Sequence, residues 1–419
     1  MTLFEQLPTI ITLIFLLTIL SYYLLIFIRQ KKAKPEHKFS SITIIIPAHN
    51  EDKYIKETIN SIIEADFNGK KQIIVVDDGS IDKTYEIASK FKPKGVKVIR
   101  IKHSGKSKSI NKALSVTKSD LIAIVDGDSY IHKDALKLIA AELERKNVAA
   151  ATGVVKVRNR NKFICMWIHI EQLYNSLMRL LFSKINANIV TPGPLSIYRR
   201  KEIMELGGFS TKGFSEDIDI TIRLIRKGYK IGFAEKAVAE TNMPYDAKGF
   251  LRQRTRFAKG ILNIFKRHMR LKKTIIDLYT LPLFFFSYIQ AIIMGSFIIY
   301  QIVSGYFTYF VSKAIYFNLT VLKFFFEWFS IVGFIKWFFG IFSGQTPLTF
   351  VTIIGIVSTL LSYPLFILAI IKFDKKFDLK HLIPIFFMFP FWLIIMVIYI
   401  LMSPNYFRKR QYNIWKKNE

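Results

Sequence analysis

Residues 121–129 are LIAIVDGDS, an apolar run that ends in two aspartates with one glycine between them. The run Leu121–Val125 is typical of a buried strand, and side chains alternate between faces along extended backbone. Asp126 and Asp128 are therefore predicted to point the same way at the carboxyl end of that strand. Ligands of open parallel α/β sheets bind at this edge.

Two carboxylates at one sheet edge suit a hard cation. Mg²⁺ and Mn²⁺ prefer oxygen ligands, and Mg²⁺ is usually held by one or two carboxylates together with substrate phosphates. Asp126 and Asp128 are thus candidate metal ligands. The alternative is a solvated turn in which both acids only cap the next helix.

The chain around this stretch alternates between predicted strands and predicted helices. Apolar, β-branched runs recur about every 25–30 residues and are separated by helical patterns such as Tyr54–Ala65, which indicates a parallel sheet covered by helices. The predicted fold is therefore α/β, with a Rossmann-like, mostly parallel sheet. The predicted strands are Ile42–Ile46, Gln72–Val76, Val96–Ile101, Leu121–Val125 and Val148–Thr152.

Two more strands are predicted to end in polar turns at the same edge: Ile42–Ile46 runs into PAHNE (47–51), and Gln72–Val76 runs into DDGS (77–80). Asp78 follows the second strand in Asp-Asp-Gly-Ser, where it either accepts from a base or ribose or caps a helix. Lys106 opens a predicted helix, where backbone donors and the dipole favour a phosphate. A solvated lysine is the alternative, and a Walker loop is excluded because Arg100 stands where its first glycine is required.

Composition indicates a membrane protein with a basic cytoplasmic part or a part that faces acidic ligands. The 419 residues are 51% hydrophobic and 15% aromatic, yet the formal net charge is +30. No zinc-finger spacing or ribonucleoprotein pattern is present, so nucleic acid is not a predicted partner. Cys165 is the only cysteine, which excludes an intramolecular disulfide.

The N-terminal segment is predicted to be a retained membrane anchor. Pro8–Ile28 carries no charge and lacks a small-residue cleavage site. Basic residues follow it at once, and the positive-inside rule places the following region in the cytoplasm. These residues are Arg29, Lys31, Lys32, Lys34 and Lys38.

Two stretches of the middle region carry further candidate residues. In 215–219, three acids within five residues begin a predicted helix, and the alternative for Asp217 is a first-turn carboxylate favoured by the macrodipole. In the basic, amphipathic segment Asp246–Lys273, residues 253, 256, 257 and 260 share one face, which presents an amide, a guanidinium and an aromatic ring. A membrane anchor explains its arginines equally well. His169 and Glu171, on a predicted helix Phe163–Phe182, are predicted to be surface or packing residues.

The C-terminal part is predicted to cross the membrane three or four times. Leu281–Ser304, Thr349–Ile371 and Leu382–Met402 are predicted spans, whereas Phe317–Phe342 either spans or lies in the interface. Basic residues cluster both near 372–380 and near 408–417, so the positive-inside rule does not decide on which side of the membrane the C-terminus lies.

The predicted organisation has five parts. They are an N-terminal membrane anchor (1–38), a catalytic domain (39–245), a basic interfacial helix (246–275), a transmembrane region (276–405) and a basic tail (406–419).

Taken together, the ordered motifs resemble the membrane-bound inverting β-glycosyltransferases of the GT-A type in glycosyltransferase family 2. This group contains the poly-N-acetylglucosamine, chitin, hyaluronan and cellulose synthases. The resemblance covers about residues 41–260. It is carried by PAHNE (47–51), DDGS (77–80), GKSKSINKAL (105–114), DGDS (126–129), TPGPLSIYRR (191–200), SEDIDIT (215–221) and QRTRF (253–257).

The resemblance implies roles for individual residues. Asp217 would be the general base, and Gln253 and Arg256 would hold the pyrophosphate near the acceptor. The nucleotide-sugar would contact Ala48, Asn50, Glu51, Asp78, Lys106, Asp126, Gly127 and Asp128, with Asp126 and Asp128 also on the metal. The acceptor would contact Gly193, Pro194, Glu216 and Phe257. Phe257 replaces the tryptophan usual in the family, which weakens the expectation of processive elongation more than that of sugar transfer.

The resulting hypothesis is a processive, metal-dependent synthase in the plasma membrane, with its catalytic domain in the cytoplasm. It would transfer a sugar, N-acetylglucosamine or glucose, from a UDP-sugar to a β-linked polysaccharide with inversion. One alternative adds a single sugar to a membrane lipid, and another is a non-catalytic membrane scaffold that binds anions. The oligomeric state stays open.

Overall fold

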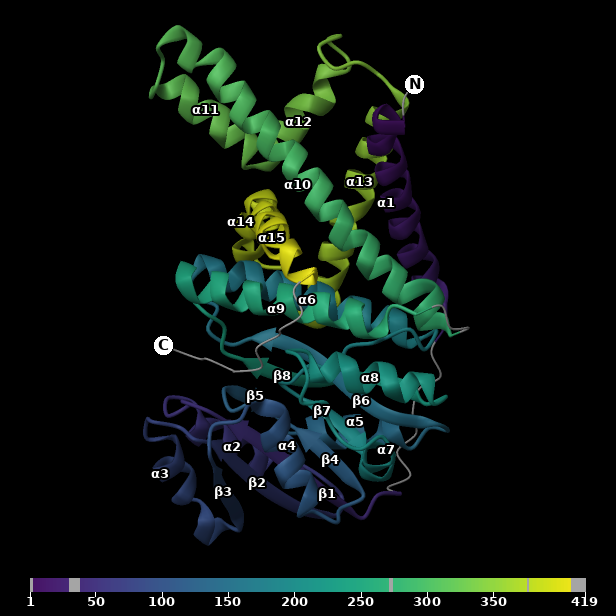
Figure 1. Ribbon diagram of the computed structural model, residues 1–419, viewed down its shortest axis with the longest axis vertical. Coiled ribbons are helices and arrows are strands. Elements are labelled where there is room, and N and C mark those ends of the chain that lie inside the picture. Colours follow the sequence, from purple (N-terminus) through teal and green to yellow (C-terminus); the bar gives the residue numbers. More distant parts are fainter. Residues whose placement is uncertain (1–2, 30–37, 271–273, 375–376, 408–419) are drawn as a thin grey trace.

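The computed structural model describes residues 3–29, 38–270, 274–374 and 377–407 (Figure 1). A sheet domain fills the lower half of Figure 1, two long helices lie across the middle, and apolar helices extend above them. The predicted basic residues Lys31, Lys32 and Lys34, and the tail from residue 408 onward, lie outside the described residues.

One sheet of eight strands forms in the described part of the chain. Its order is β3-β2-β1-β4-β7-β6-β8-β5. The strands are β1 (Ser41–Ala48), β2 (Lys70–Asp78), β3 (Val96–Ile101), β4 (Leu121–Ile124), β5 (Ser129–Ile131), β6 (Val148–Val157), β7 (Ser196–Arg199) and β8 (Lys230–Thr241).

The five predicted strands are confirmed, and the sheet is mostly parallel. β1 pairs in parallel with β2 and β4, β2 with β3, and β6 with β8. The exceptions are β7, which lies antiparallel between β4 and β6, and β5, which pairs antiparallel with β8. The mixed, curled sheet is typical of the GT-A fold.

Helices cover both faces of this sheet because its strands are apolar on both sides. Ile44 and Ile46 pack in one core with α2 and α5, whereas Ile45 packs in a second core with α4, α7 and α8. These helices are α2 (Ile55–Glu64), α3 (Thr84–Ser89), α4 (Lys106–Ser115), α5 (Ala135–Leu143), α7 (Arg200–Glu205) and α8 (Glu216–Arg226).

The two helices between the sheet and the apolar helices are α6 (Phe163–Ser183) and α9 (Ala247–His268) (Figure 1). The Asp246 side chain caps α9 by accepting from the Gly249 amide. Buried residues of both helices, such as Leu173 and Phe250, pack in one core with Ile370 and Phe391 of the apolar helices. The sheet layer and the apolar layer therefore share a hydrophobic core.

An ion-paired cluster also joins the two layers. Asp374, at the end of a long apolar helix, accepts from His169 of α6 at 2.7 Å and contacts Lys156 of β6 at 2.8 Å. His381 lies 3.2 Å from the same carboxylate. His169 is fully buried, so it is a packing residue that connects the sheet layer to the apolar helices.

Four helical segments are long and apolar enough to cross a membrane, namely Gln6–Phe27, Ile276–Lys313, Phe350–Asp374 and Met388–Tyr406. The helices of this layer are α1 (Leu3–Phe27), α10 (Leu281–Tyr309), α11 (Leu319–Trp328), α12 (Ile331–Gly340), α13 (Phe350–Asp374), α14 (Leu379–Phe386) and α15 (Met388–Met402). Short 3-10 or π turns occur at Lys92–Lys94, Ile276–Thr280, Val311–Lys313 and Ser403–Tyr406.

The ambiguous segment 317–342 forms the two short helices α11 and α12, and neither has the length of a span. Two of the three charges that interrupt its apolar run pair with each other, because Lys336 Nζ lies 2.9 Å from Glu327 Oε2. The predicted span Leu382–Met402 is divided at Phe387 into α14 and α15.

Candidate active site

The turn after β4 places both aspartates of the D-G-D sequence at a cavity. Val125 donates to Ile45 O at 3.1 Å, and Asp126 donates to Gly193 O at 3.1 Å, so the turn is held between β1 and the loop before β7. Asp126 and Asp128 both line a cavity of about 600 Å³. Asp128 also accepts from the Thr241 hydroxyl at 3.3 Å.

The same cavity gathers residues from distant parts of the sequence. Ten of the sequence-predicted site residues line it: Lys106, Asp126, Asp128, Gly193, Pro194, Glu216, Asp217, Gln253, Arg256 and Phe257. Five others are not among its lining residues: Ala48, Asn50, Glu51, Asp78 and Gly127. Their predicted nucleotide contacts stay predictions.

Lys106 connects the acids of the cavity. Its Nζ lies 2.6 Å from Asp126 Oδ1 and 3.3 Å from Glu216 Oε1. Burial lowers the pKa of Lys106, but the attraction of Asp126 and Glu216 outweighs burial, so the pKa is raised and the ammonium group stays charged.

Close approach explains the glycine at position 193. A Cβ on Gly193 would collide with Asp126 Oδ2 and Lys106 Nζ, so only glycine lets this loop lie against the ion pair. Position 260 on α9 is similar, because a Cβ there would collide with the Ser215 hydroxyl. α9 can therefore approach the start of α8.

Asp217 occupies the first turn of α8, as the sequence predicted, and lines the cavity. Burial, together with repulsion from Glu216, raises the pKa of Asp217 to about 7, while Lys106 opposes the rise. A carboxylate with such a pKa can accept a proton near neutral pH.

α9 contributes the Gln253, Arg256 and Phe257 side chains to the cavity wall. Their common face agrees with the predicted i, i+3, i+4 spacing. The Gln253 amide donates to Met243 Sδ at 3.3 Å, and its Oε1 is buried without a hydrogen-bond partner in the described structure. Arg256 lies over the Phe257 ring at 5.6 Å.

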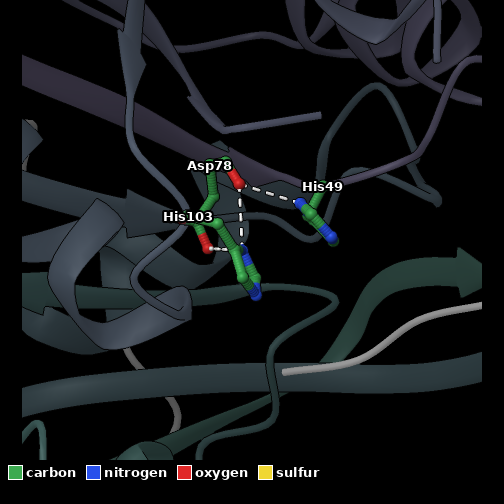
Figure 2. A group of neighbouring side chains, drawn as sticks. All are labelled: His49, Asp78 and His103. Atoms are coloured by element: carbon green, nitrogen blue, oxygen red, sulfur yellow. Dashed lines mark hydrogen bonds and ion pairs between the residues drawn. The ribbon is translucent and has the colours of Figure 1, made fainter. Parts of the chain in front are cut away.

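Asp78 supports the loop that carries Lys106. Its carboxylate is fully buried and accepts from the Ser104 and Gly105 amides, each at 2.8 Å. Figure 2 shows His49 and His103 beside it: both Nδ1 atoms point to the Asp78 carbonyl oxygen, at 2.8 and 3.0 Å, and the rings stack at 4.2 Å.

These three residues also form a group with metal-ligand spacing. The Nδ1 atoms of His49 and His103 must carry protons to donate to the Asp78 carbonyl, so these two nitrogens cannot ligate, and the Nε2 of His49 accepts from the Asn50 amide at 3.3 Å. The observed contacts therefore favour a hydrogen-bonded brace beneath the Ser104–Gly105 turn.

The cavity extends from the acids to the apolar helices. Its walls at that end include side chains from α1, α10 and α15, among them Tyr22, Phe284, Tyr288, Trp392 and Tyr399. A polar end and an aromatic end thus share one space.

Sequence reasoning did not assign a site role to four charged residues of the cavity wall, Lys108, Glu171, Arg179 and Arg254. Glu171 and Arg254 form a buried bidentate pair between α6 and α9, with distances of 2.6 and 2.5 Å. For Glu171 and Arg179 the available signal was a charge within the apolar pattern of 163–182, where such residues are expensive to bury without a partner.

The fold and the acidic cavity define a class of protein: a GT-A-type domain joined to helices that are long and apolar enough to cross a membrane. Residues 43–207 match the family model described as "Glycosyl transferase family 2", so the chain carries a domain of that family. This confirms the family resemblance found in the sequence.

Three curated relatives are glycosyltransferases. A probable glycosyltransferase of Bacillus subtilis is 31% identical over 59% of this chain and 62% of its own length. An N-acetylglucosaminyltransferase of Azorhizobium caulinodans is 28% identical over 56% of this chain and 63% of its own. A poly-beta-1,6-N-acetyl-D-glucosamine synthase of Staphylococcus aureus is 24% identical over 53% and 55%. The matched region therefore spans less than two thirds of these relatives.

A solved structure shares the fold over nearly the whole chain. It is a mannosyltransferase of Pyrobaculum calidifontis in complex with GDP-Man and Mn²⁺. Its TM-score is 0.60, its identity is 16%, and the alignment covers 97% of both chains. At this identity the likeness concerns the fold alone.

Proposed function

We propose that this chain transfers a sugar, N-acetylglucosamine or glucose, from a UDP-sugar to a β-linked glycan with inversion. The observation that carries the proposal is one cavity lined by Asp126, Asp128, Asp217 and the Gln253–Arg256 face of α9. The relatives named as N-acetylglucosaminyl enzymes support UDP-N-acetylglucosamine as the donor. The relative named as a synthase supports a processive reaction.

A divalent cation, Mg²⁺ or Mn²⁺, fits the residues of the cavity. Asp126 and Asp128 offer hard oxygen donors, and the Lys106 ammonium at 2.6 Å from Asp126 indicates that this carboxylate stabilises a cation. Asp126 and Asp128 would hold the ion, which would supply Lewis-acid stabilisation of the departing diphosphate.

The residues of the chain would divide the remaining chemistry between them. Asp217 would accept the proton of an acceptor hydroxyl as that oxygen attacks the anomeric carbon from the face opposite the diphosphate. The C–O bond to the diphosphate breaks as the new glycosidic bond forms, which inverts the centre. Gln253, Arg256 and Lys106 would stabilise the charge that develops on the diphosphate.

A second candidate is the addition of one sugar to a lipid acceptor. It is favoured by the aromatic end of the cavity, where Tyr288, Trp392 and Tyr399 belong to helices of the apolar layer. An amphiphilic acceptor could place its hydroxyl or phosphate at Asp217 while its chain stays among those helices. Phe257, 44% exposed, offers a smaller stacking surface than a tryptophan for an elongating glycan.

The proposed location is the plasma membrane, with several spans and the sheet domain in the cytoplasm. The uncharged anchor followed by basic residues supports this orientation. Donor nucleotide and divalent cation would then reach the cavity from the cytoplasm.

The test is the size of the product. Membranes that contain the protein are incubated with labelled UDP-sugars and Mg²⁺ or Mn²⁺, and the products are separated by length. A ladder of long glycans supports the processive reaction, and one discrete lipid-linked species supports the second candidate.

The scaffold alternative is tested with single variants. Asp126→Asn, Asp128→Asn and Asp217→Asn should each strongly reduce transfer under standard assay conditions while expression stays normal. Wild-type protein that transfers nothing from any UDP-sugar would overturn the proposed function.

A further inference from the structure

Arg179 is a buried cation in the wall of the cavity. It lies on α6, its exposed fraction is 6%, and it belongs to the same helix face as the cavity residues Glu171, Gln172 and Asn175. The proposed reaction gives this residue no role.

The guanidinium of Arg179 has no carboxylate within ion-pair distance in the described part of the chain. Its hydrogen bond goes to the Ser176 hydroxyl at 2.8 Å, and its Nε is buried without a partner. Arg254 is equally buried, at 6%, and its Nε also lacks a partner, but Glu171 supplies a counter-charge and accepts two short hydrogen bonds from its other two nitrogens. The two arginines line one cavity, and the contrast sets Arg179 apart.

A buried guanidinium without a counter-charge destabilises the folded protein. Its charge is removed from water, and a single hydroxyl does not compensate for the loss. Burial lowers the pKa of Arg179 to about 10, against the opposing attraction of Asp217, and the group is still charged near neutral pH. Such a residue gains most from an anionic ligand that enters the cavity.

We propose that Arg179 binds a phosphate group in this cavity. A guanidinium fork can donate two parallel hydrogen bonds to two phosphate oxygens. A bound phosphate would also supply the negative charge that the Ser176 hydroxyl does not provide. The inference rests on the proposed function, because it takes the cavity as the place where donor and acceptor meet.

The phosphate has two possible sources. One is the diphosphate of the donor nucleotide, which would lie near Lys106 and Asp126. The other is the head group of a phosphorylated lipid, which would enter from the aromatic end of the cavity. α6 packs against α1, α13 and α14 as well as against the sheet, so it faces both sources.

Binding measurements on the purified full-length protein distinguish these sources. The probes are UDP, a short polyprenyl phosphate and the matching uncharged polyprenol, each titrated by calorimetry into wild type, Arg179→Gln and Arg179→Lys. The matched control is Arg145→Gln, since Arg145 pairs with Glu142 outside the cavity.

Arg179→Gln should weaken binding of at least one phosphate probe by about tenfold or more, because a hydrogen bond between charged groups is lost. Arg179→Lys should weaken it less, and Arg145→Gln should leave it unchanged. A loss confined to UDP assigns Arg179 to the donor, and a loss confined to polyprenyl phosphate assigns it to the acceptor. Unchanged binding of both probes overturns the proposal.

A melting experiment without ligand excludes a purely structural role. Arg179→Met should leave the Tm unchanged or raise it, whereas Arg254→Met should lower it, because only Arg254 has a carboxylate partner. A lower Tm for Arg179→Met would contradict the proposal. Neither measurement needs turnover, so a negative transfer assay and a negative result here are separate outcomes.

Discussion

The Lys106 ammonium nitrogen lies 2.6 Å from Oδ1 of Asp126, the first aspartate of the D-G-D turn. This pair joins the start of α4 to the end of β4, and Glu216 extends it to the start of α8. A cation bound by Asp126 would compete with Lys106 for the same carboxylate. Lys106 would then be free to contact the donor diphosphate.

Lys106→Gln should therefore weaken binding of the UDP-sugar donor. We expect the KM for the UDP-sugar to rise about 10- to 100-fold, as a charged hydrogen bond to phosphate is worth roughly 1.5–3 kcal/mol. Steady-state kinetics with the preferred donor measures the change. Lys97→Gln is the control, because Lys97 is exposed on β3. Equal KM values for both variants would exclude Lys106 from donor binding.

Asp217→Asn should lower kcat by about 10²- to 10⁴-fold and leave UDP binding nearly unchanged, because it removes proton acceptance alone. Calorimetry with UDP and single-turnover transfer measure the two effects. The exposed acid Asp134 provides the matched control, Asp134→Asn. A variant that loses UDP binding together with turnover would instead indicate that Asp217 holds the donor.

The rate should also depend on pH. Burial and Glu216 raise the pKa of Asp217 to about 7, so below that pH the carboxyl is protonated and cannot accept a proton. The transfer rate should rise as pH rises through about 7 and then level off. Lys106 opposes the upward shift, so Lys106→Gln should move the rise to higher pH. A flat profile between about pH 5 and 9 would argue against Asp217 as the base.

Metal removal should stop the reaction. Treatment with EDTA is expected to abolish transfer, and Mg²⁺ or Mn²⁺ should restore it because Asp126 and Asp128 offer oxygen ligands. Asp128→Asn should need a higher metal concentration for half-maximal rate. Full activity in EDTA would show that the side-chain cations of Lys106 and Arg256 stabilise the departing diphosphate without a metal ion.

The Glu171–Arg254 pair should contribute to stability more than to chemistry. Glu171→Gln or Arg254→Met leaves one buried group without its partner, which costs about 3–5 kcal/mol. Thermal unfolding of the purified protein measures this loss. The double variant Glu171→Gln/Arg254→Met should recover part of it, and additive losses would mean that the two residues are not coupled.

The two ends of the segment 372–405 should lie on the same side of the membrane. Lys372 pairs with Glu235 of β8 at 2.8 Å, and Lys266 of α9 donates to Asn405 O at 3.2 Å. Both contacts are with the sheet side of the molecule. A C-terminal reporter should therefore be cytoplasmic, as should a cysteine placed at Lys102. If the C-terminal reporter and the cysteine at position 102 were labelled from opposite sides of the membrane, this arrangement would be contradicted.

Local sequence determined the strands, the helix starts and the acidic edge. β-Branched apolar runs form β1 to β4 because both of their faces are covered, and Ser215–Asp217 begins α8 where the acids suggested a first turn. The spacing of Gln253, Arg256 and Phe257 needed only the helix period to place them on one face. These features depend on neighbours a few residues apart.

Only the tertiary structure decided which side chains meet. The antiparallel strand β7 separates β4 from β6, and Glu171 pairs with Arg254 across 83 residues. Arg179 faces the same cavity with no carboxylate within ion-pair distance among the described residues. Helical periodicity shows that a charge interrupts an apolar face, but it cannot show whether a distant residue satisfies that charge. The sequence thus determined where acids and cations stand along the chain, and the packing of α6 and α9 over the sheet decided which of them are paired.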